Sequence, residues 1–246
     1  MINLKTKEEI KIMSEAGKKL AKIMGALKKE IQPGIKTKFL DDLFLKLVKE
    51  EKAEPAFLNY NGFPAAICIS KNETIVHGIP SNDLIASGDL VKLDIGLKYQ
   101  GFYADMADTI GVQEIKPEEE KLILAVREAF YNALKFLYPN NTLGDIGYAI
   151  ESTAKKYGFS VADKLTGHGI GRNLHEEPQV LNTGTPKKGI KLQVGMVLAI
   201  EPMFVLGKGE VVEKKDGSFK SKDNSFTAHY EHTVAILENG PLILTQ

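Results

Sequence analysis

The first 50 residues alternate apolar and polar positions with the period of an α-helix. Apolar side chains recur every three or four residues between positions 10 and 31, and Thr6 followed by Glu9 is typical of a capping box. These features predict a helix of about 25 residues that ends before Pro33. Thr37 then predicts the cap of a second, shorter helix.

The same order of elements recurs about 106 residues later. Pro117 stands at the first turn of a predicted helix, glutamates follow it at the positive end of the helix dipole, and Thr142 caps a further helix that ends at Gly158. Apolar runs outside the helices, such as 65–69 and 74–77, predict strands.

This repeat predicts an α+β fold built from two pseudo-symmetric halves, at about 7–112 and 117–246. Helices are expected on one face of an antiparallel sheet that the halves share. No linker or low-complexity segment separates the halves, so we expect a single domain over residues 1–246.

One predicted hairpin carries two aspartates. Residues 90–112 form two apolar runs, and with Tyr99 and Gln100 as the loop, Asp94 lies directly opposite Asp105. Like charges opposite each other in an antiparallel pair destabilise the sheet. The carboxylates must therefore share a proton, pair with cations or hold a metal, unless the register is slipped and one faces solvent.

Other polar residues interrupt apolar strands. Glu201 follows Val197–Ile200, where a buried carboxylate is unfavourable unless it is paired or metal-bound; the alternative is an edge strand with Glu201 facing water. Glu231 and His232 begin a closing strand, and alternation alone leaves either one as the inward residue. His168 lies between glycines, which would let its backbone approach a bulky or charged group. The alternative is that His168 is an ordinary hydrogen-bonded side chain.

Composition narrows the class of protein. Lys and Arg number 32, as do Asp and Glu, so no net charge favours nucleic acid or membranes. The single cysteine, Cys68, excludes an internal disulfide and suits a reducing cytoplasm. The sequence shows neither a signal peptide nor the roughly 20 apolar residues of a membrane span. We therefore expect a soluble, cytoplasmic protein.

Several common motifs are excluded. Residues 167–171 lack the spacing of a dinucleotide-binding loop, residues 175–179 lack the second histidine of a helical zinc motif, and no cysteine pair can hold structural zinc. Four carboxylates and one imidazole are left, on or near strands: Asp94, Asp105, His168, Glu201 and Glu231. Four negative charges can converge around about two divalent cations, and mixed oxygen and nitrogen donors suit Mn, Fe, Co or Zn better than Mg or Ca.

These residues, their order and their surroundings resemble the type I methionine aminopeptidases of the pita-bread (creatinase/aminopeptidase) fold. The resemblance covers nearly the whole chain. The matching stretches are Asn59–Pro64, Ala66–Ser70, His77–Pro80, Asp94 eleven residues before Asp105, Gly167–Arg172, His175–Gln179, Ile200–Pro202 and Tyr230–His232.

The resemblance implies an enzyme that removes the initiator methionine from nascent proteins when the second residue is small. It implies two divalent metal ions, bridged by Asp105 and Glu231. Asp94 completes one site, and His168 with Glu201 completes the other. The ions activate a water molecule that attacks the scissile carbonyl.

The resemblance also assigns residues to the substrate. Glu201 is similar to the family's proton shuttle, and His77 and His175 resemble two histidines that hold the substrate amide and stabilise the tetrahedral intermediate; support of the metal ligands is their alternative role. The methionine pocket would be apolar and soft, which suits a thioether. Its residues would be Phe57, Tyr60, Phe63, Cys68 and Leu174.

The chain departs from the family pattern at the pocket. Gly96 stands where a threonine is frequent, Ser218 where many bacterial members have tryptophan, and Phe57 and Phe63 where a cysteine and a tyrosine are common. These departures concern the pocket rim and selectivity, not the metal chemistry.

Three alternatives and several partners follow. Prolidase and aminopeptidase P use the same metal set but carry an additional amino-terminal domain. Type II enzymes need a long insertion, for which the separation of 33 residues from His168 to Glu201 leaves no room. A non-catalytic relative would lack some of the ligands. We expect a monomer that acts on peptide amino termini without a membrane. Eight lysines are candidates for ribosome docking, with a solvated surface as the simpler explanation: Lys187, Lys188, Lys191, Lys208, Lys214, Lys215, Lys220 and Lys222.

Overall fold

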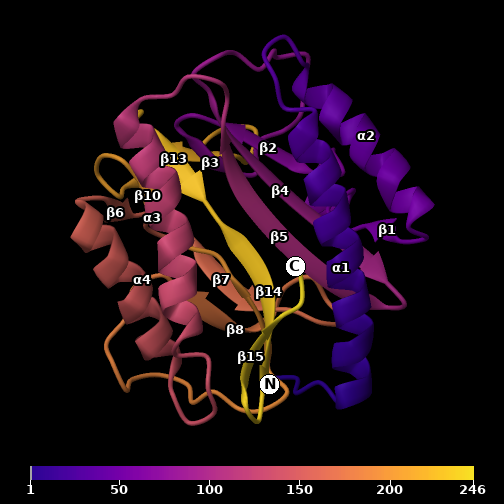
Figure 1. Ribbon diagram of the computed structural model, residues 1–246, viewed down its shortest axis with the longest axis vertical. Helices are drawn as coiled ribbons and strands as arrows, with labels where there is room; N and C mark the ends of the chain where they lie inside the picture. The colour runs from indigo at the N-terminus through magenta and orange to yellow at the C-terminus, as the bar shows by residue number, and fades with distance from the viewer. Residues whose placement is uncertain (1) are drawn as a thin grey trace.

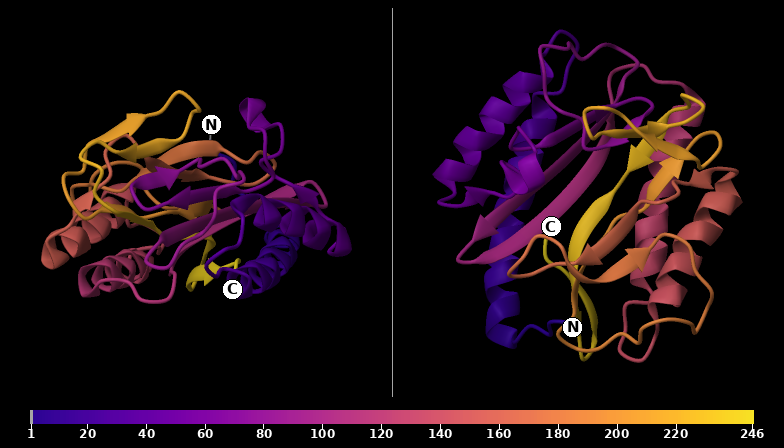
Figure 2. Two further views of the ribbon diagram at one scale, coloured as in Figure 1. Left: turned by 90° about the horizontal axis from the view of Figure 1, so that it is seen from above. Right: turned by 180° about the vertical axis from the view of Figure 1, so that it is seen from behind.

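Helices cover one face of an antiparallel sheet in the computed structural model, which describes residues 2–246 (Figure 1). Seen from behind, the sheet faces the viewer and the helices lie beyond it (Figure 2). The four α-helices of the described residues are α1 (Lys7–Lys29), α2 (Thr37–Glu50), α3 (Pro117–Leu134) and α4 (Leu143–Tyr157). The predicted α+β architecture, with helices on one side, is confirmed.

The main sheet has nine strands within residues 2–246, and its central order is β1-β4-β5-β14-β9-β7-β8, with β2 on β4 and β15 on β14. Its strands are β1 (Glu54–Pro55), β2 (Cys68–Lys71), β4 (Leu90–Tyr99), β5 (Phe102–Gly111), β7 (Thr166–Gly169), β8 (Glu176–Leu181), β9 (Val197–Ile200), β14 (Glu231–Leu237) and β15 (Gly240–Ile243). All of its pairings are antiparallel.

Two small sheets complete the strands. One contains β6 (Ser160–Val161), β10 (Met203–Val205) and β13 (Thr227–His229); the other contains β3 (Thr74–Val76), β11 (Val211–Glu213) and β12 (Phe219–Ser221). A 3₁₀ turn, η1, spans Tyr60–Gly62. The second small sheet joins β3 of the first half to β11 and β12 of the second half, so the halves are connected there as well as through the main sheet.

Local sequence signals place most helix ends. The predicted capping box between Thr6 and Glu9 begins α1, Thr142 caps α4, and Gly158 ends α4 in the left-handed conformation. The prediction for Thr37 was wrong, because Lys36 is the cap of α2. The Thr37 hydroxyl instead donates to the Ser81 carbonyl at 3.1 Å and accepts from the Ser81 amide at 2.8 Å, which ties α2 to a loop.

The predicted register of the aspartate hairpin was also wrong. Tyr99 pairs with Phe102, so the two loop residues are Gln100 and Gly101, not Tyr99 and Gln100. Both loop residues have positive φ, at 47° and 83°. A two-residue hairpin loop of type I′ requires positive φ at both positions, and glycine adopts it at no steric cost. The glycine therefore sets the loop one position later than predicted.

This shift changes the neighbours of the two aspartates but not their face. Asp105 lies opposite Gly96, and Asp94 lies opposite Ala107. The partner of Asp94 moves by two residues along β5, from the expected Asp105 to Ala107. Because side chains alternate with a period of two, this shift keeps both carboxylates on one face. They are diagonal neighbours instead of a directly opposed pair.

The other face of the sheet is apolar and packs against helices. Buried side chains of β4 and β5 meet α1 and α2, and those of β9 and β14 meet α3 and α4. The strand residues involved are Val91, Leu93, Ile95, Leu97, Ala104, Met106, Leu198, Ile200, Val234 and Ile236. Alternation then directs the residues between them, Asp94 and Asp105 among these, to the face without helices.

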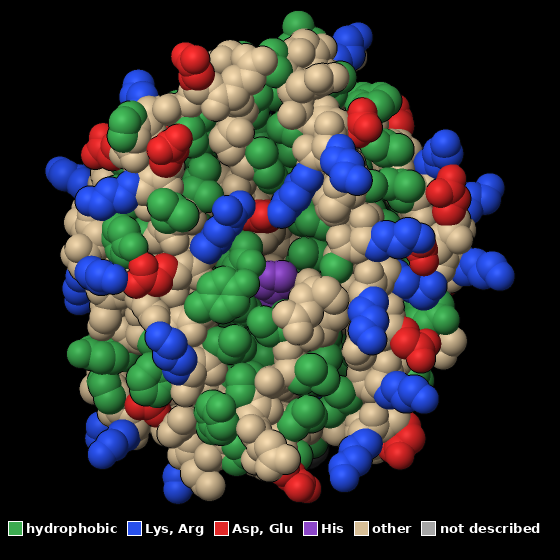
Figure 3. Space-filling view, in the orientation of Figure 1, with side chains coloured by type: hydrophobic (Ala, Val, Ile, Leu, Met, Phe, Trp, Pro, Cys, Tyr) green, Lys and Arg blue, Asp and Glu red, His purple; other side chains and the backbone are tan. Residues whose placement is uncertain are grey.

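The surface of the helix-covered face mixes charges. Lys and Arg alternate with Asp and Glu around its rim, while hydrophobic side chains gather toward its centre (Figure 3). This mixture matches the formal net charge of zero. None of the helices in residues 2–246 combines the length and the apolarity that a membrane span requires.

Candidate metal centre and active site

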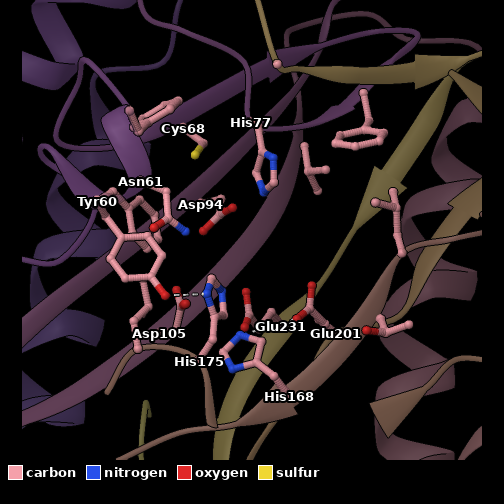
Figure 4. Close-up of a pocket in the computed structure, with 18 of the residues that line it drawn as sticks. Tyr60, Asn61, Cys68, His77, Asp94, Asp105, His168, His175, Glu201 and Glu231 are labelled. Carbon is pink, nitrogen blue, oxygen red and sulfur yellow. Dashed lines mark hydrogen bonds and ion pairs between the residues drawn. The ribbon is translucent and has the colours of Figure 1, made fainter. Parts of the chain in front are cut away.

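A cavity of about 810 Å³ opens on the face of the sheet that lacks helices (Figure 4). Its lining includes every site residue that the sequence predicts: Phe57, Tyr60, Phe63, Cys68, His77, Asp94, Asp105, His168, Leu174, His175, Glu201 and Glu231. Residues from both halves of the chain therefore meet in one pocket, beside an apolar wall.

The five predicted metal donors come from five strands that are neighbours in the sheet. Their order across the sheet is β4, β5, β14, β9 and β7. Four of these strands contain one donor each, and the fifth donor, Glu201, directly follows β9. In the order of the strands, the donors are Asp94, Asp105, Glu231, Glu201 and His168. The sheet thus brings together side chains that are far apart in the sequence.

Glu231 is the inward residue of the pair that the sequence left open. It lines the cavity, whereas His232 lies on the opposite face of the sheet. The His232 ring contacts the Tyr230 hydroxyl through Nε2 at 2.9 Å and the Thr245 hydroxyl through Nδ1 at 2.8 Å. Its hydrogen bonds are satisfied by neighbouring side chains, so His232 is a structural residue.

The donor atoms lie close enough to share metal ions. Atoms of Asp105, His168 and Glu231 lie within 4.8 Å of one another, and so do atoms of Glu201, His229 and Glu231. Glu231 belongs to both groups. Two sets of donors with a shared carboxylate are the arrangement that adjacent cations require.

Several of these donors have no protein partner. Asp94 Oδ1, Asp105 Oδ1 and Glu231 Oε1 are buried, and residues 2–246 provide none of them with a hydrogen bond. Buried polar atoms in proteins are almost always hydrogen-bonded, and exceptions need an explanation such as an ion. Carboxylate oxygens with free lone pairs, together with imidazole nitrogen, fit a divalent metal of the Mn, Fe, Co or Zn type.

Burial raises the pKa of every carboxyl group in the cluster. The pKa of Asp94 rises to about 7, chiefly through burial. Burial and neighbouring carboxylates raise the pKa values of Asp105 and Glu231 well above the usual range, and burial alone does so for Glu201. Cations would offset this repulsion and restore the charged forms.

His168 has the protonation state of a metal ligand. Burial, assisted by the neighbouring His175, lowers the pKa of His168 to about 3, which leaves the ring neutral. Its Nδ1 lies 2.9 Å from the Gly169 carbonyl oxygen, which can only accept. The proton therefore lies on Nδ1, and Nε2 offers a lone pair to the cavity.

Backbone contacts hold the carboxylates in place. Thr233 Oγ1 donates to the Asp105 carbonyl at 2.8 Å and accepts from the Asp105 amide at 3.0 Å. Asn182 Nδ2 donates to the Glu201 carbonyl at 2.9 Å. These bonds fix β5 and the end of β9, so the donors are positioned before a metal binds.

His175 faces the cavity beside the donors, and its ring is oriented by Tyr60 (Figure 4). The Tyr60 hydroxyl lies 2.9 Å from His175 Nδ1. When Tyr60 donates this bond, the proton of the neutral ring lies on Nε2 and can be donated to a substrate oxygen. The next residue, Glu176, accepts from buried Lys5 at 2.6 Å, which anchors the segment that carries His175.

His77 enters the same cavity from the opposite side. Its φ of 57° is left-handed, which is uncommon for a residue with a side chain and often marks a functional site. Its ring meets the Phe219 ring at 5.8 Å in an edge-on geometry. His77 thus lies on the side of Cys68 and Asp94, whereas His175 lies beside Asp105 and His168 (Figure 4).

Two of the departures from the family pattern belong together. A Cβ atom built on Gly96 would lie 2.8 Å from Phe57 Cε1 and 3.0 Å from the Ala56 side chain. The Phe57 ring therefore fills the space that a side chain at position 96 would need. A phenylalanine at 57 and a glycine at 96 form one complementary pair, which the sequence does not reveal because the two positions lie 39 residues apart.

The third departure, Ser218, does not line the cavity. Ser218 is buried, and its amide and hydroxyl both donate to Asp216 Oδ1. Asp216, Gly217 and Phe219 line the cavity instead. The turn between β11 and β12 therefore reaches the rim of the pocket, and Phe219 is the apolar side chain that it contributes there.

His229 is a site residue that sequence reasoning missed. It is 1 % exposed, and its Nε2 lies 3.6 Å from Glu201 Oε2 and 3.7 Å from Glu231 Oε2. The available signal was its position two residues before Glu231, since alternate residues of an extended segment share a face. Burial lowers the pKa of His229 to about 4, so the ring is neutral.

The chain is similar to known proteins along its whole length. The sequence profile of metallopeptidase family M24 matches residues 11–238. The chain belongs to this family of metallopeptidases, which are hydrolases that use divalent metal ions. Its relatives include the methionine aminopeptidase of Clostridium perfringens, which is 44% identical over 246 residues. This alignment covers 100% of this chain and 99% of that protein. The resemblance read from the sequence motifs is confirmed.

Solved structures show the same fold. The crystal structure of a methionine aminopeptidase from Thermotoga maritima superposes on this chain with a TM-score of 0.98 at 42% sequence identity. The match covers 100% of both chains. The prolidase of Pyrococcus furiosus superposes with a TM-score of 0.82 at 28% identity, and the match covers 99% of this chain but 65% of that chain. The fold is therefore the pita-bread fold, and the full-length match is to a methionine aminopeptidase.

Proposed function

We propose that the chain is a methionine aminopeptidase with two divalent ions, which removes the initiator methionine from nascent proteins when the second residue is small. The observation that carries this proposal is the cavity itself. Five metal donors from five adjacent strands border an apolar wall made of Phe57, Tyr60, Phe63, Cys68 and Leu174. The full-length likeness to methionine aminopeptidases supports the same conclusion.

The donors divide between the two ions. Asp105 and Glu231 would bridge them, Asp94 would complete one site, and His168 with Glu201 would complete the other. This division follows the resemblance to the family, and the unpaired oxygens of Asp94, Asp105 and Glu231 and the lone pair of His168 Nε2 support metal binding by these side chains. The metal would be Co, Mn, Fe or Zn. When bound, the ions would polarise the scissile carbonyl and make an activated water available near neutral pH.

The protein groups perform the other steps of the hydrolysis. Glu201 would take a proton from the attacking water and deliver it to the nitrogen of the leaving peptide, as the C–N bond breaks. The His175 Nε2–H would donate to the oxygen that gains charge, because Tyr60 occupies Nδ1. His77, on the other side of the cavity, would hold the peptide amide.

The apolar wall would select the amino-terminal side chain. An unbranched thioether fits a soft pocket beside a crowded metal centre, and a large second residue would collide with the walls that bear His77 and His175. With Phe57 and Phe63 in the wall, norleucine should substitute well for methionine. A methylene is worth about 1–3 kcal/mol in such a pocket, so leucine should be a poor substrate but not an inert one.

Residues from both halves of the chain line the cavity, which supports action as a single catalytic domain. That the protein is a monomer stays a prediction. Of the lysines considered for ribosome docking, Lys214 and Lys222 pair with Asp216 and Glu210. These pairs favour a solvated surface over a basic patch, so ribosome docking is not part of the proposal.

A peptide panel tests the function. The metal-loaded enzyme is assayed with Met-Ala-Ser, norleucine-Ala-Ser, Met-Leu-Ser, Leu-Ala-Ser and Ala-Pro-Ser, and values of kcat/KM are compared. We expect the first two to be best. A preference for Ala-Pro-Ser would assign the protein to the proline-specific relatives instead, and metal binding without any turnover would indicate a non-catalytic member.

A further inference from the structure

The proposed mechanism leaves one buried imidazole of the cluster without a role. His229 ends β13 just before β14, is 1 % exposed, and sits beside the carboxylates of Glu201 and Glu231. Neither of its ring nitrogens has a hydrogen-bond partner within residues 2–246. A buried ring with both nitrogens unpaired is unfavourable unless a group outside the protein satisfies it.

The distances around His229 are those of ligands that share an ion. Its Nε2 lies 3.6 Å from Glu201 Oε2 and 3.7 Å from Glu231 Oε2, beyond the range of N–H···O hydrogen bonds. Two donors that bind one ion at about 2.1 Å, at angles between tetrahedral and trigonal, lie roughly 3.4–3.6 Å apart. The three atoms are therefore too far apart to bond directly and close enough to bind one cation.

Glu201 has the same relation to a second imidazole. Its Oε1 lies 3.6 Å from His168 Nε2, while its Oε2 faces His229. The Glu201 carboxylate thus stands between two neutral rings, one from β7 and one from β13. This symmetry distinguishes His229 from a histidine that merely fills space.

We propose that His229 is an additional metal ligand, which binds through Nε2 the ion held by Glu201 and Glu231. The inference rests on the proposed function, because it concerns one of the two ions of that centre. The centre then has two imidazoles, one on each side of Glu201. Since imidazole nitrogen favours zinc, cobalt and iron over manganese and magnesium, His229 would bias the site toward the former ions.

The first test counts imidazoles in the wild-type protein. X-ray absorption on protein loaded with two equivalents of zinc reports the histidine ligands around the metal, and it needs no variant. We expect two imidazoles for two zinc ions. A count of one imidazole for two zinc ions would overturn the proposal, because His168 alone accounts for it.

The second test compares affinities. His229→Gln keeps a polar side chain of similar size, and competition with a fluorescent chelator measures its zinc and manganese binding. Loss of a ligand should weaken zinc binding by at least about 100-fold, at the weaker of the protein's two metal sites or at both. Manganese binding should weaken by less. A zinc affinity equal to wild type in a folded His229→Gln protein would refute ligation.

His232→Gln is the matched control. His232 is also buried and only three positions along the chain, but its two nitrogens already bond Thr245 and Tyr230. Its replacement should leave the zinc affinity and the imidazole count unchanged. If the wild-type protein binds no metal and releases no methionine, the proposed function is wrong. If it binds two zinc ions and releases methionine, but only one imidazole binds the zinc, only the role of His229 is wrong.

Discussion

Asp105 and Asp108 stand three residues apart on β5, and both are 4% exposed, yet their surroundings differ completely. Asp108 lies on the helix side, where Arg127 donates to it through Nε at 3.1 Å and Nη2 at 2.8 Å and Lys28 pairs with its other oxygen. Asp105 lies on the cavity side, and its Oδ1 has no hydrogen-bond partner among residues 2–246.

The difference between these aspartates holds for the two faces of the sheet. On the helix face, apolar side chains pack in register and the buried charges are paired by the protein itself. On the cavity face, carboxylates converge without protein cations, which destabilises the fold in isolation. A buried charge that the protein leaves unpaired therefore indicates a partner from outside, whereas a paired one indicates a role in folding.

The largest expected effect comes from Asp105→Asn. Loss of one charge at a bridging position leaves two ions under-neutralised, so we expect kcat/KM to fall by at least about a thousandfold, or ~4 kcal/mol. In metal-free protein the same change removes repulsion, and the melting temperature should rise. Kinetics and thermal unfolding in a chelator measure both. Near-normal turnover with two ions bound would contradict the assignment.

His175→Ala should have the next largest effect. The side chain is placed to bind substrate and not metal, so kcat should fall by about 10²–10³-fold, or 2.7–4 kcal/mol, with little change in bound metal. Metal analysis accompanies the kinetics. Tyr60→Phe serves as a milder variant, because it keeps the ring but removes the hydroxyl that orients His175. If one ion is missing from His175→Ala, the residue is a ligand.

Asp108→Asn tests the helix face. The amide cannot pair with two cations, but Lys28 and Arg127 are 36% and 38% exposed, so solvent screens the loss. We expect the free energy of unfolding to fall by about 1–2 kcal/mol, with metal affinity and kcat unchanged. Urea unfolding and metal titration provide the measurement. A loss of metal without a loss of stability would reverse the distinction between the two faces.

The pH dependence of metal-free stability gives the smallest effect. The pKa of Asp94 rises from 3.8 to about 7 on folding, so the folded state binds more protons between these values and the free energy of unfolding falls as pH rises through them. Histidines with lowered pKa values, His168 at about 3 and His229 at about 4, act in the opposite sense, but only below their unfolded value of 6.5.

Between pH 6.5 and about 7 the histidines no longer oppose Asp94, and we expect stability to fall by up to about 1.4 kcal/mol per pH unit for each carboxylate that titrates. Asp105, Glu201 and Glu231, whose pKa values are also raised, act in the same sense. Urea unfolding in a chelator at several pH values measures the slope. Added divalent ion should abolish it, and Asp105→Asn should reduce it. A stability that is flat or rises over this range in chelator would show that the cluster is not repulsive.

Much of the architecture was readable from local pattern. Capping boxes and the positions of Pro117 and Gly158 located helix ends, and apolar alternation located both faces of the sheet. The register of the aspartate hairpin was not readable in the same way, because Gln100 has to adopt an uncommon positive φ. The actual partner of Asp94 lies two residues from the predicted one, which is an even shift, so Asp94 and Asp105 still face the same cavity.

The site was predictable where a charged residue interrupts an apolar stretch of sequence. Glu201 after an apolar strand is such a case, and its buried position confirms that it does not face water from an edge strand. The fit of Phe57 to Gly96 and the approach of His229 to Glu201 depend on contacts between distant segments. No local pattern records such contacts, because each residue alone is compatible with many environments.

The position of β14 has a consequence for how the protein forms during synthesis. This strand lies in the sheet between β5 and β9, and its Thr233 bonds to Asp105 across 128 positions of sequence. A nascent chain that has reached residue 230 can form the β4–β5 hairpin with α1 and α2, but the inner edge of β5 stays unpaired and open to aggregation. Such long-range pairing forms slowly. The arrival of β14 closes that edge and delivers Glu231 in one event, so structural completion and enzymatic competence begin together.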